Sequence, residues 1–206
     1  MPTCYFAPFA VDDRRFSLGT TEAFEREAAR LDFGLPADGP VAVYAGKLQD
    51  FKRVADLIQA AQGLVHVFVI GTGEEDEPLR LLAETEWVTF AGFVYQTAMP
   101  AAIACADIVV LPSEREAWGL AVNEAMSAGC LPIVSDRVGC APDLVEGVGW
   151  VYPVGDVSAL RAALRDACAV VGDASASDAV KRRISQYSMT ECVSGYERAV
   201  VAALGS

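Results

Sequence analysis

Histidine, positive charge and long apolar runs are all scarce in this sequence. Its one histidine, His66, lies inside an apolar run, and its cysteines include no C-x-x-C pair, so neither a zinc site nor a disulfide framework is supported. Lys and Arg number 16 against 28 Asp and Glu, for a formal net charge of −12. Binding a nucleic acid requires a basic surface that displaces counterions, so we expect no nucleic-acid partner, although a small anion still fits a local basic site.

The six cysteines are widely spaced, and most stand beside Ala, Leu or Val, where a buried reduced thiol is the common state. They are Cys4, Cys105, Cys130, Cys140, Cys168 and Cys192. We expect them to be reduced and structural.

No apolar run approaches the roughly 18 residues of a membrane span, and the opening MPTCYFAPFAVDD has no basic segment followed by an apolar one. With 53% hydrophobic and 21% charged residues over 206 positions, the composition is that of a globular chain with one sizeable core. We therefore expect a single domain, 1–206, in the cytoplasm.

Short apolar runs alternate with segments of helical periodicity. Runs rich in β-branched residues predict strands over 41–46, 65–71, 87–92, 107–113, 131–136 and 149–154. The segments between them predict helices over 53–62, 77–85, 98–106, 120–129 and 141–147. The alternation predicts a three-layer, Rossmann-like α/β domain, with a parallel sheet between helical layers and ligands beyond the carboxyl ends of the strands.

Three segments follow the last predicted strand. Residues 155–171 predict a helix with Asp156 as its N-cap. The Ala-, Ser- and Asp-rich segment 172–180 predicts a surface connection, and 181–206 predicts a terminal helical arm.

Two lysines flank the turn after the first predicted strand. In AGKLQDFKRVADLI, Lys47 and Lys52 stand near the start of the next predicted helix. Ammonium groups beside the free amides and positive dipole end of a helix can bind a phosphate. Lysines near a surface loop also keep an acidic protein soluble, and both interpretations fit the spacing.

The segment VFVIGTGEE places Gly71 and Gly73 at the end of the second predicted strand, where glycines allow a sharp turn and close approach of a ligand. The third glycine of a dinucleotide fingerprint is missing, and the acids at 74–77 would repel a pyrophosphate. A dehydrogenase-type cofactor site is therefore disfavoured.

The segment after the fourth predicted strand, EREAWGLAVNEAMSAG, places the carboxylates of Glu116 and Glu124 eight positions apart around an aromatic-Gly step. Glu116 is expected in the loop and Glu124 about one turn into the next helix, where a carboxylate can accept paired sugar or ribose hydroxyls. Amides around Trp118, Gly119 and Leu120 would point into the same crevice. Alternatively, Glu116 is an acid favoured by the helix dipole and Glu124 a solvated helix residue.

Together, these loops resemble the C-terminal, donor-binding half of the retaining family-four glycosyltransferases, whose GT-B fold has two facing Rossmann-like domains. GKLQDFKRVADLIQA resembles the family segment G-R-L-x-x-x-K-G-x-x-x-L-I-x-A, and EAWGLAVNE matches the E-x7-E signature. VIGTG, AGFV, ADIVVLPS, EAMSAGCLPIVSD and VGCAPDLVEGVGWVYPVGD follow in the family's order, so the resemblance covers roughly positions 5 to 200.

The resemblance implies roles for the charged residues. Lys47 and Lys52, beside Gly46, would hold the diphosphate of a nucleoside diphosphate sugar, such as a UDP- or GDP-sugar, and would stabilise the departing diphosphate without a metal. Glu116 would contact hydroxyls of the transferred hexose, so Glu116 and Lys52 are the expected catalytic residues. Glu124 would accept the ribose hydroxyls.

Backbone groups complete the implied site. Amides near Trp118, Gly119 and Leu120 would approach the sugar and phosphates, and the backbone at Phe93 and Val94 would lie along the base.

The chain also departs from the family pattern. Lys47 stands where the family usually has Arg, which keeps the charge and loses the planar fork that binds phosphate bidentately. Ala117 and Trp118 replace the Gly and Phe of a common E-G-F-G, which puts a methyl group and an indole near the donor sugar.

By the same resemblance, the partner of this chain is an N-terminal domain that carries the acceptor site. YFAPFAVDDRRFS resembles the start of the C-terminal half, so Met1 to Thr3 are expected to mark the edge of an excised domain. The isolated chain would bind donor and transfer little, and the full-length protein would be cytoplasmic or peripheral to the inner face of the membrane.

The final helix of this fold usually crosses to the N-terminal domain. An apolar face on the arm is therefore expected to be partly uncovered and open to a homodimer contact. This face consists of Tyr187, Met189, Val193, Tyr196 and Val200.

The primary hypothesis is thus the donor-binding domain of a retaining hexosyltransferase of polysaccharide biosynthesis, with a glycan or lipid-linked acceptor. One alternative is a non-catalytic nucleotide-binding or regulatory module of the same fold. Another is an epimerase or phosphorylase of the same architecture, for which His66 is poorly placed and a pyridoxal-type motif is lacking.

Overall fold

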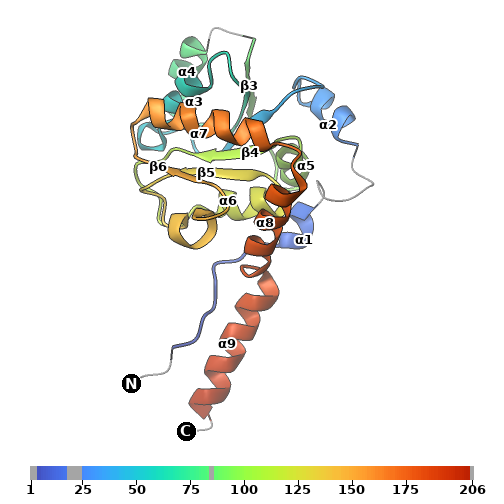
Figure 1. Cartoon of the computed structure of the whole chain (residues 1–206), viewed down its shortest axis with the longest axis vertical. Coiled ribbons are helices and arrows are strands. Elements are labelled where there is room, and N and C mark those ends of the chain that lie inside the picture. Colours follow the sequence, from blue (N-terminus) through green and yellow to red (C-terminus); the bar gives the residue numbers. More distant parts are fainter. Residues whose placement is uncertain (1–3, 18–24, 84–85, 205–206) are drawn as a thin grey trace.

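A single parallel sheet of six strands forms the centre of the computed structural model, which describes residues 4–17, 25–83 and 86–204 (Figure 1). The strand order is β3-β2-β1-β4-β5-β6. The strands are β1 Val41–Ala45, β2 His66–Ile70, β3 Val88–Gly92, β4 Ile108–Leu111, β5 Leu131–Ser135 and β6 Trp150–Tyr152. All six predicted strands are confirmed, and each is one to three residues shorter than predicted. Met1 to Thr3 lie outside the described residues.

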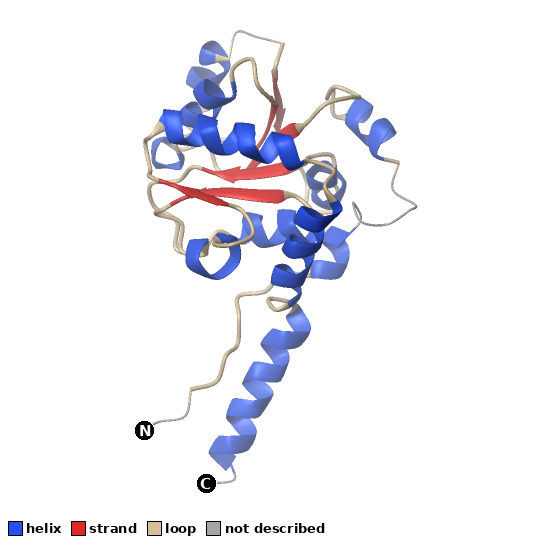
Figure 2. Cartoon of the chain, in the orientation of Figure 1, coloured by secondary structure: helices blue, strands red, loops and turns tan. Residues whose placement is uncertain are grey.

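Helices lie on both faces of the sheet (Figure 2). They are α1 Asp13–Phe16, α2 Arg26–Asp32, the 3-10 helix η2 Asp50–Lys52, α3 Val54–Ala61, α4 Asp76–Leu82, α5 Met99–Ala104, α6 Leu120–Ser127, the π-helix η3 Ala141–Val145, α7 Val157–Val170, α8 Ala174–Ser185 and α9 Met189–Leu204. The helices predicted between the strands are confirmed, with 84–85 outside the described residues. No helix in the described part of the chain has both the length and the apolar composition of a membrane span.

Alternate residues of each central strand enter different hydrophobic cores. In β1, Ala42 and Tyr44 belong to the core that includes residues of α3 and α7, whereas Val41 and Val43 belong to the core that includes residues of α5. Because successive side chains of a strand point to opposite faces, a sheet covered on both sides requires continuous apolar strands. This burial explains why the strands were visible as unbroken apolar runs.

The predicted surface connection over 172–180 is wrong, since most of this segment belongs to α8. Asp173 caps the helix, its Oδ1 accepting a hydrogen bond from the backbone amide of Ser175 at 2.7 Å. Alanine is the strongest helix former, and Val180 and Ile184 give the helix one face to bury. The predicted cap of the preceding helix is confirmed, because Asp156 Oδ1 accepts from the Ala159 amide at 2.8 Å.

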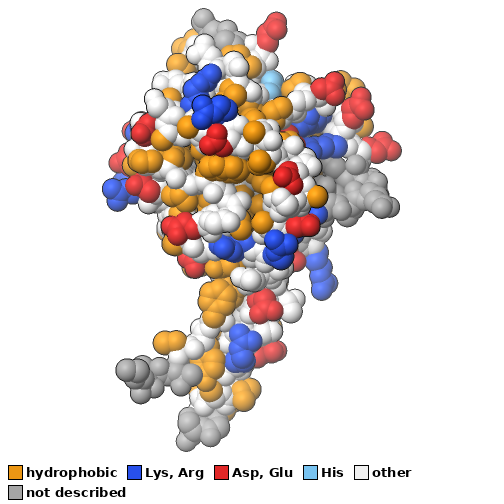
Figure 3. Space-filling model, in the orientation of Figure 1, with side chains coloured by type: hydrophobic (Ala, Val, Ile, Leu, Met, Phe, Trp, Pro, Cys, Tyr) orange, Lys and Arg blue, Asp and Glu red, His pale blue; other side chains and the backbone are white. Residues whose placement is uncertain are grey.

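Helix α9 extends away from the sheet, next to the N-terminal segment (Figure 1), and carries hydrophobic side chains on its surface (Figure 3). Tyr187, predicted to be part of its uncovered face, is instead only 8% exposed. Its ring packs near Trp118, and its hydroxyl donates to Asp143 Oδ1 at 3.2 Å. The other four residues are confirmed as 45% to 64% exposed, and these are Met189, Val193, Tyr196 and Val200.

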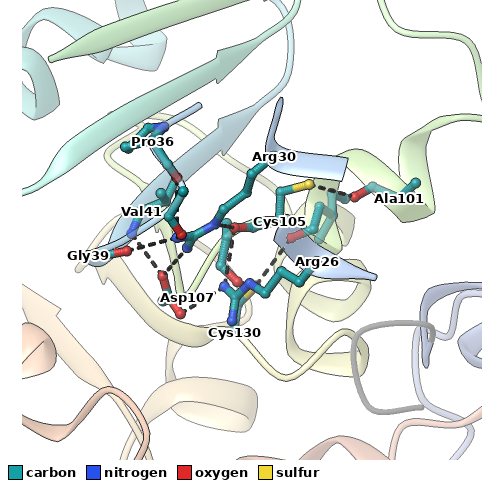
Figure 4. A network of polar contacts seen from close by, with 12 residues as sticks. Arg26, Arg30, Pro36, Gly39, Val41, Ala101, Cys105, Asp107 and Cys130 are labelled. Carbon is teal, nitrogen blue, oxygen red and sulfur yellow. Dashed lines mark hydrogen bonds and ion pairs between the residues drawn. The ribbon is translucent and has the colours of Figure 1, made fainter. Parts of the chain in front are cut away.

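A buried ion-pair network fixes α2 to the amino ends of β1 and β4 (Figure 4). Asp107 Oδ2 accepts from Arg30 Nη2 and from the Val41 amide, both at 2.8 Å, and Oδ1 accepts from Arg26 Nη2 at 2.7 Å. The Arg30 and Asp107 side chains are 6% and 9% exposed. Arg30 also donates to carbonyls of the loop that enters β1. The sequence analysis missed this network, since Asp107, which joins its members, lies 77 residues from Arg30 and 66 residues from Val41.

Candidate functional site

The order of the strands reverses next to β1. This strand pairs with β2 on one side and with β4 on the other, so the loops that leave β1 and β4 turn away to different faces of the sheet. In open α/β sheets, such a switch point opens a crevice beyond the carboxyl ends of the strands. Lys47, Lys52 and Glu116 lie on these two loops, and Glu124 lies in the helix that follows the second one.

The loop after β1 rests directly on the loop after β2. The amides of Gly46 and Leu48 donate to carbonyls of the β2 end and loop at 2.9 and 3.0 Å. A Cβ atom on Gly71 would lie 1.8 Å from the Gly46 carbonyl oxygen, and one on Gly73 would lie 2.0 Å from that of Leu48. The G-x-G of this chain therefore allows two loops to pack backbone against backbone.

Tyr44 supports the same loop from inside the core. Its side chain is fully buried, and its hydroxyl donates to the Lys47 carbonyl at 2.8 Å. Burial, assisted by the negative charge of Glu116, raises the pKa of the Tyr44 hydroxyl, so it remains a neutral donor. The Lys47 side chain is exposed above it. The sequence analysis did not consider Tyr44, although a tyrosine near the end of an otherwise aliphatic strand was a usable signal.

Lys52 and Glu116 form an ion pair between the loops after β1 and β4. Lys52 Nζ lies 2.6 Å from Glu116 Oε2, and the side chains are only 16% and 21% exposed. Lys52 ends η2, whereas Glu116 lies on the loop after β4, held by a backbone bridge to Val138. The ion-pair partner of Glu116 is thus 64 residues away in the sequence. One ammonium and one carboxylate thus face the same space, a pair suited to a phosphate and to hydroxyl groups.

Helix α6 begins at the crevice, as predicted. Its N-cap, Gly119, has a φ of 103°, in the region that favours glycine, and a Cβ atom there would lie 2.8 Å from Leu111 Cδ2. Within the described residues, the amides of Gly119 and Leu120 donate no hydrogen bond to a protein acceptor. Free amides at a helix N-terminus are suited to an anion.

The Trp118 indole has protein partners on several sides. Its Nε1 donates to Asn123 Oδ1 at 2.9 Å, and its ring lies 5.0 Å from the ring of Phe9. Asn123 in turn donates to the Phe9 carbonyl at 3.1 Å. The indole therefore joins α6 to the N-terminal segment, while the backbone of Trp118 remains on the loop that carries Glu116.

Glu124 lies one turn into α6 and is half-buried. Burial raises its pKa, and the nearby positive charge of Arg15 opposes this rise. Arg15 also donates to the Gln96 carbonyl at 2.7 Å, which ties α1 to the loop after β3. No hydrogen bond or ion pair joins Glu124 to the Lys52–Glu116 pair in the described chain.

The loop after β3 presents aromatic side chains to solvent. Phe93 and Tyr95 are exposed, and their rings pack edge to face with centroids 5.2 Å apart, while Val94 is partly buried. The predicted base-contacting backbone therefore lies on an accessible loop at the sheet edge.

His66 is partly buried and three of the six cysteines are buried, whereas Cys4 is exposed. His66 Nε2 lies 2.9 Å from Thr89 Oγ1. The cysteines form no disulfide in the described structure, and burial raises the pKa of Cys105 to about 11 and of Cys130 to about 12. The described residues contain no group of three or more His, Cys, Asp or Glu placed to hold a metal ion.

Comparison with known proteins gives a family match over most of the chain. The model of the glycosyl transferases group 1 family matches residues 25–188. Sulfoquinovosyl transferase SQD2 of Arabidopsis thaliana is 34% identical over 152 residues, which cover 66% of this chain and 29% of that protein. D-inositol 3-phosphate glycosyltransferase of Mycobacterium leprae is 33% identical over 133 residues, which cover 59% of this chain and 31% of that protein. The chain thus spans less than a third of either relative.

A solved structure of Anabaena HepE in complex with UDP and glucose has the same fold, with a TM-score of 0.75 at 19% identity. The match covers 94% of this chain and 55% of that chain. By family and by fold, the chain belongs to the glycosyl transferases group 1 family and corresponds to the C-terminal half of a GT-B glycosyltransferase.

Proposed function

We propose that this chain binds a nucleoside diphosphate sugar as the donor half of a retaining glycosyltransferase that transfers a hexose to a glycan or lipid-linked acceptor. The Lys52–Glu116 pair at the switch point of the sheet carries this proposal. The pair places an ammonium group, which can bind phosphate, beside a carboxylate, which can bind hydroxyls, and both side chains are largely buried. A sugar diphosphate presents phosphate and hydroxyl groups together.

The surroundings of the pair suit the two ends of such a donor. Lys52 and the exposed Lys47 supply positive charge for the diphosphate, together with the free amides of Gly119 and Leu120. When the bond between the sugar and the diphosphate breaks, negative charge accumulates on the departing diphosphate, and preorganised cations stabilise it. We propose that these lysines, without a metal ion, perform that task, and that Glu116 orients the sugar through its hydroxyls.

The relatives support a nucleotide sugar as the donor. HepE was solved with UDP and glucose, and the two curated relatives are named as transferases of sugars. Because this chain corresponds to about half of such structures, we propose that a second, N-terminal domain supplies the acceptor site and that this chain alone transfers little. A homodimer through α9 stays a prediction that the oligomeric state in solution would test.

A thermal-shift panel tests donor binding. A ligand that binds only the folded state, at a hundred times its Kd, should raise the melting temperature of a chain this size by about 5 to 10 °C. The panel would contain UDP, GDP, ADP, TDP and their common sugar conjugates, with pyrophosphate as the control for phosphate binding alone. A rise with one base over the others would support the proposal and identify the nucleotide, whereas no rise with any nucleotide would contradict it.

Glu124→Ala should weaken nucleoside and nucleoside diphosphate binding alike, by about 1 to 3 kcal/mol, because charged hydrogen bonds to the ribose are lost. Titration calorimetry with both ligands would measure this, with Glu197→Ala on α9 as the control. Since burial raises the pKa of Glu124, nucleoside affinity should also fall as the pH decreases through that raised value, and Glu124→Gln should remove this dependence. Unchanged nucleoside affinity in Glu124→Ala would refute the ribose assignment.

A further inference from the structure

Arg53 has an unusual backbone for its residue type. Among the described residues other than glycine, it alone has a positive φ, 54°, with a ψ of 36°. This left-handed conformation is unfavourable for a residue with a side chain and free of strain for glycine. Arg53 therefore holds its side chain at the cost of a strained backbone.

The guanidinium of Arg53 connects two segments. It donates to Asp56 on the first turn of α3, with Nε–Oδ2 and Nη2–Oδ1 distances of 2.8 and 3.3 Å. Its Nη1 lies 3.9 Å from Glu114 Oε2, on the loop after β4. The loop after β4 is also hydrogen-bonded to the segment after β1 through the backbone, since the Glu114 amide donates to the Phe51 carbonyl at 2.8 Å. Arg53 therefore reinforces a contact between the loop after β1 and the loop after β4.

These are the two loops that carry the charged pair of the candidate site. Lys52 directly precedes Arg53, and Glu116 follows Glu114 by two residues on the same loop. The guanidinium also lies against the loop after β6, because a Cβ atom on Gly155 would be 3.3 Å from Arg53 Nη2. With Asp56 taking two of its donors, Arg53 is arranged to hold the loops rather than to bind a ligand.

We propose that Arg53 is a positioning residue for donor binding, which holds the loops after β1 and β4 at the spacing where Lys52 and Glu116 act on one ligand. This inference rests on the proposed function. This role accounts for the strained backbone at Arg53. A glycine there would relieve the strain but would lose the contacts with Asp56 and Glu114.

Arg53→Gly separates this role from a general contribution to stability. Glycine adopts the observed φ without strain, which offsets the stability lost when the buried Asp56 carboxylate loses its partner, so the melting temperature should change little. Affinity for the nucleoside diphosphate identified by the thermal-shift panel should fall about tenfold, since small displacements of positioned groups weaken their joint action. Affinity for the free nucleoside, whose ribose would bind Glu124 on α6, should not change. Arg53→Lys, which keeps the charge near Glu114, should recover part of the loss.

The control is Arg165→Ala, which removes one positive charge from the exposed surface of α7 and should leave both affinities unchanged. Calorimetry with nucleoside and nucleoside diphosphate would be run on the whole chain. An unchanged diphosphate affinity in folded Arg53→Gly would overturn the inference and leave the proposed function intact. Equal losses for both ligands with a lower melting temperature would overturn it too, by assigning Arg53 to the fold. No nucleotide binding by the unmodified chain would overturn both proposals.

Discussion

Replacing Asp107 with alanine should lower the free energy of unfolding by about 3 to 5 kcal/mol, because it leaves a buried guanidinium without its counter-charge. Arg30 is almost fully buried and donates to Asp107 at 2.8 Å. The Val41 amide loses its side-chain acceptor in the same step. Since a domain is typically stable by about 5 to 15 kcal/mol, this loss removes a large share of the stability of the fold.

Urea unfolding followed by tryptophan fluorescence would measure this effect, and Asp166→Ala provides the matched control. Asp166 pairs with Arg165 at 3.4 Å on the exposed surface of α7, so its loss should change stability by no more than about 0.5 kcal/mol. Asp107→Asn keeps one acceptor oxygen, so its free energy of unfolding should lie between those of Asp107→Ala and Asp166→Ala. If Asp107→Ala were as stable as Asp166→Ala, the network would contribute nothing to the fold. Asp107 lies at the amino ends of β1 and β4, whereas the proposed donor site lies at the carboxyl ends of the strands. A folded Asp107→Asn should therefore bind nucleotides normally.

Lys52→Ala should weaken nucleoside diphosphate binding by about 2 to 4 kcal/mol, or roughly 30- to 1,000-fold, and leave nucleoside binding unchanged. The effect has two sources. The diphosphate loses a charged hydrogen bond, and Glu116, now paired with Lys52 at 2.6 Å, is left as an uncompensated negative charge in the crevice. Lys47→Ala should have a smaller effect, since the Lys47 side chain is exposed and solvent screens its charge.

A double-mutant cycle with Glu116→Gln separates these sources. Adding Glu116→Gln to Lys52→Ala should recover about 1 to 2 kcal/mol of diphosphate affinity, because the repulsive charge is removed. Calorimetry with nucleoside and nucleoside diphosphate would be run on both single variants and on the double variant. Equal losses for both ligands in Lys52→Ala would show that the lysine acts through the fold, and would contradict its assignment to the diphosphate.

The strands and most helices could be predicted from the sequence because burial on both faces of the sheet leaves a local record. Every strand is a short apolar run, and α3 and α7 carry apolar residues at helical spacing. The prediction for 172–180 was wrong because Ser and Asp favour turns and helix caps alike, and only the packing of Val180 and Ile184 shows which applies. Tyr187 was placed on the exposed face because the break between α8 and α9, which turns it inward, has no glycine or proline to mark it.

The sequence by itself determined the alternation of strands and helices, the loops that carry the charged residues and the resemblance to the family, since each depends on residues that are close in the chain. Only the tertiary structure decided that Lys52 pairs with Glu116, that Arg53 links their loops and that Asp107 anchors α2. The physical reason is the strand order. It places β1 beside β4, although β2, β3 and their helices lie between them in sequence, and local patterns of polarity carry no information about which strand becomes the neighbour.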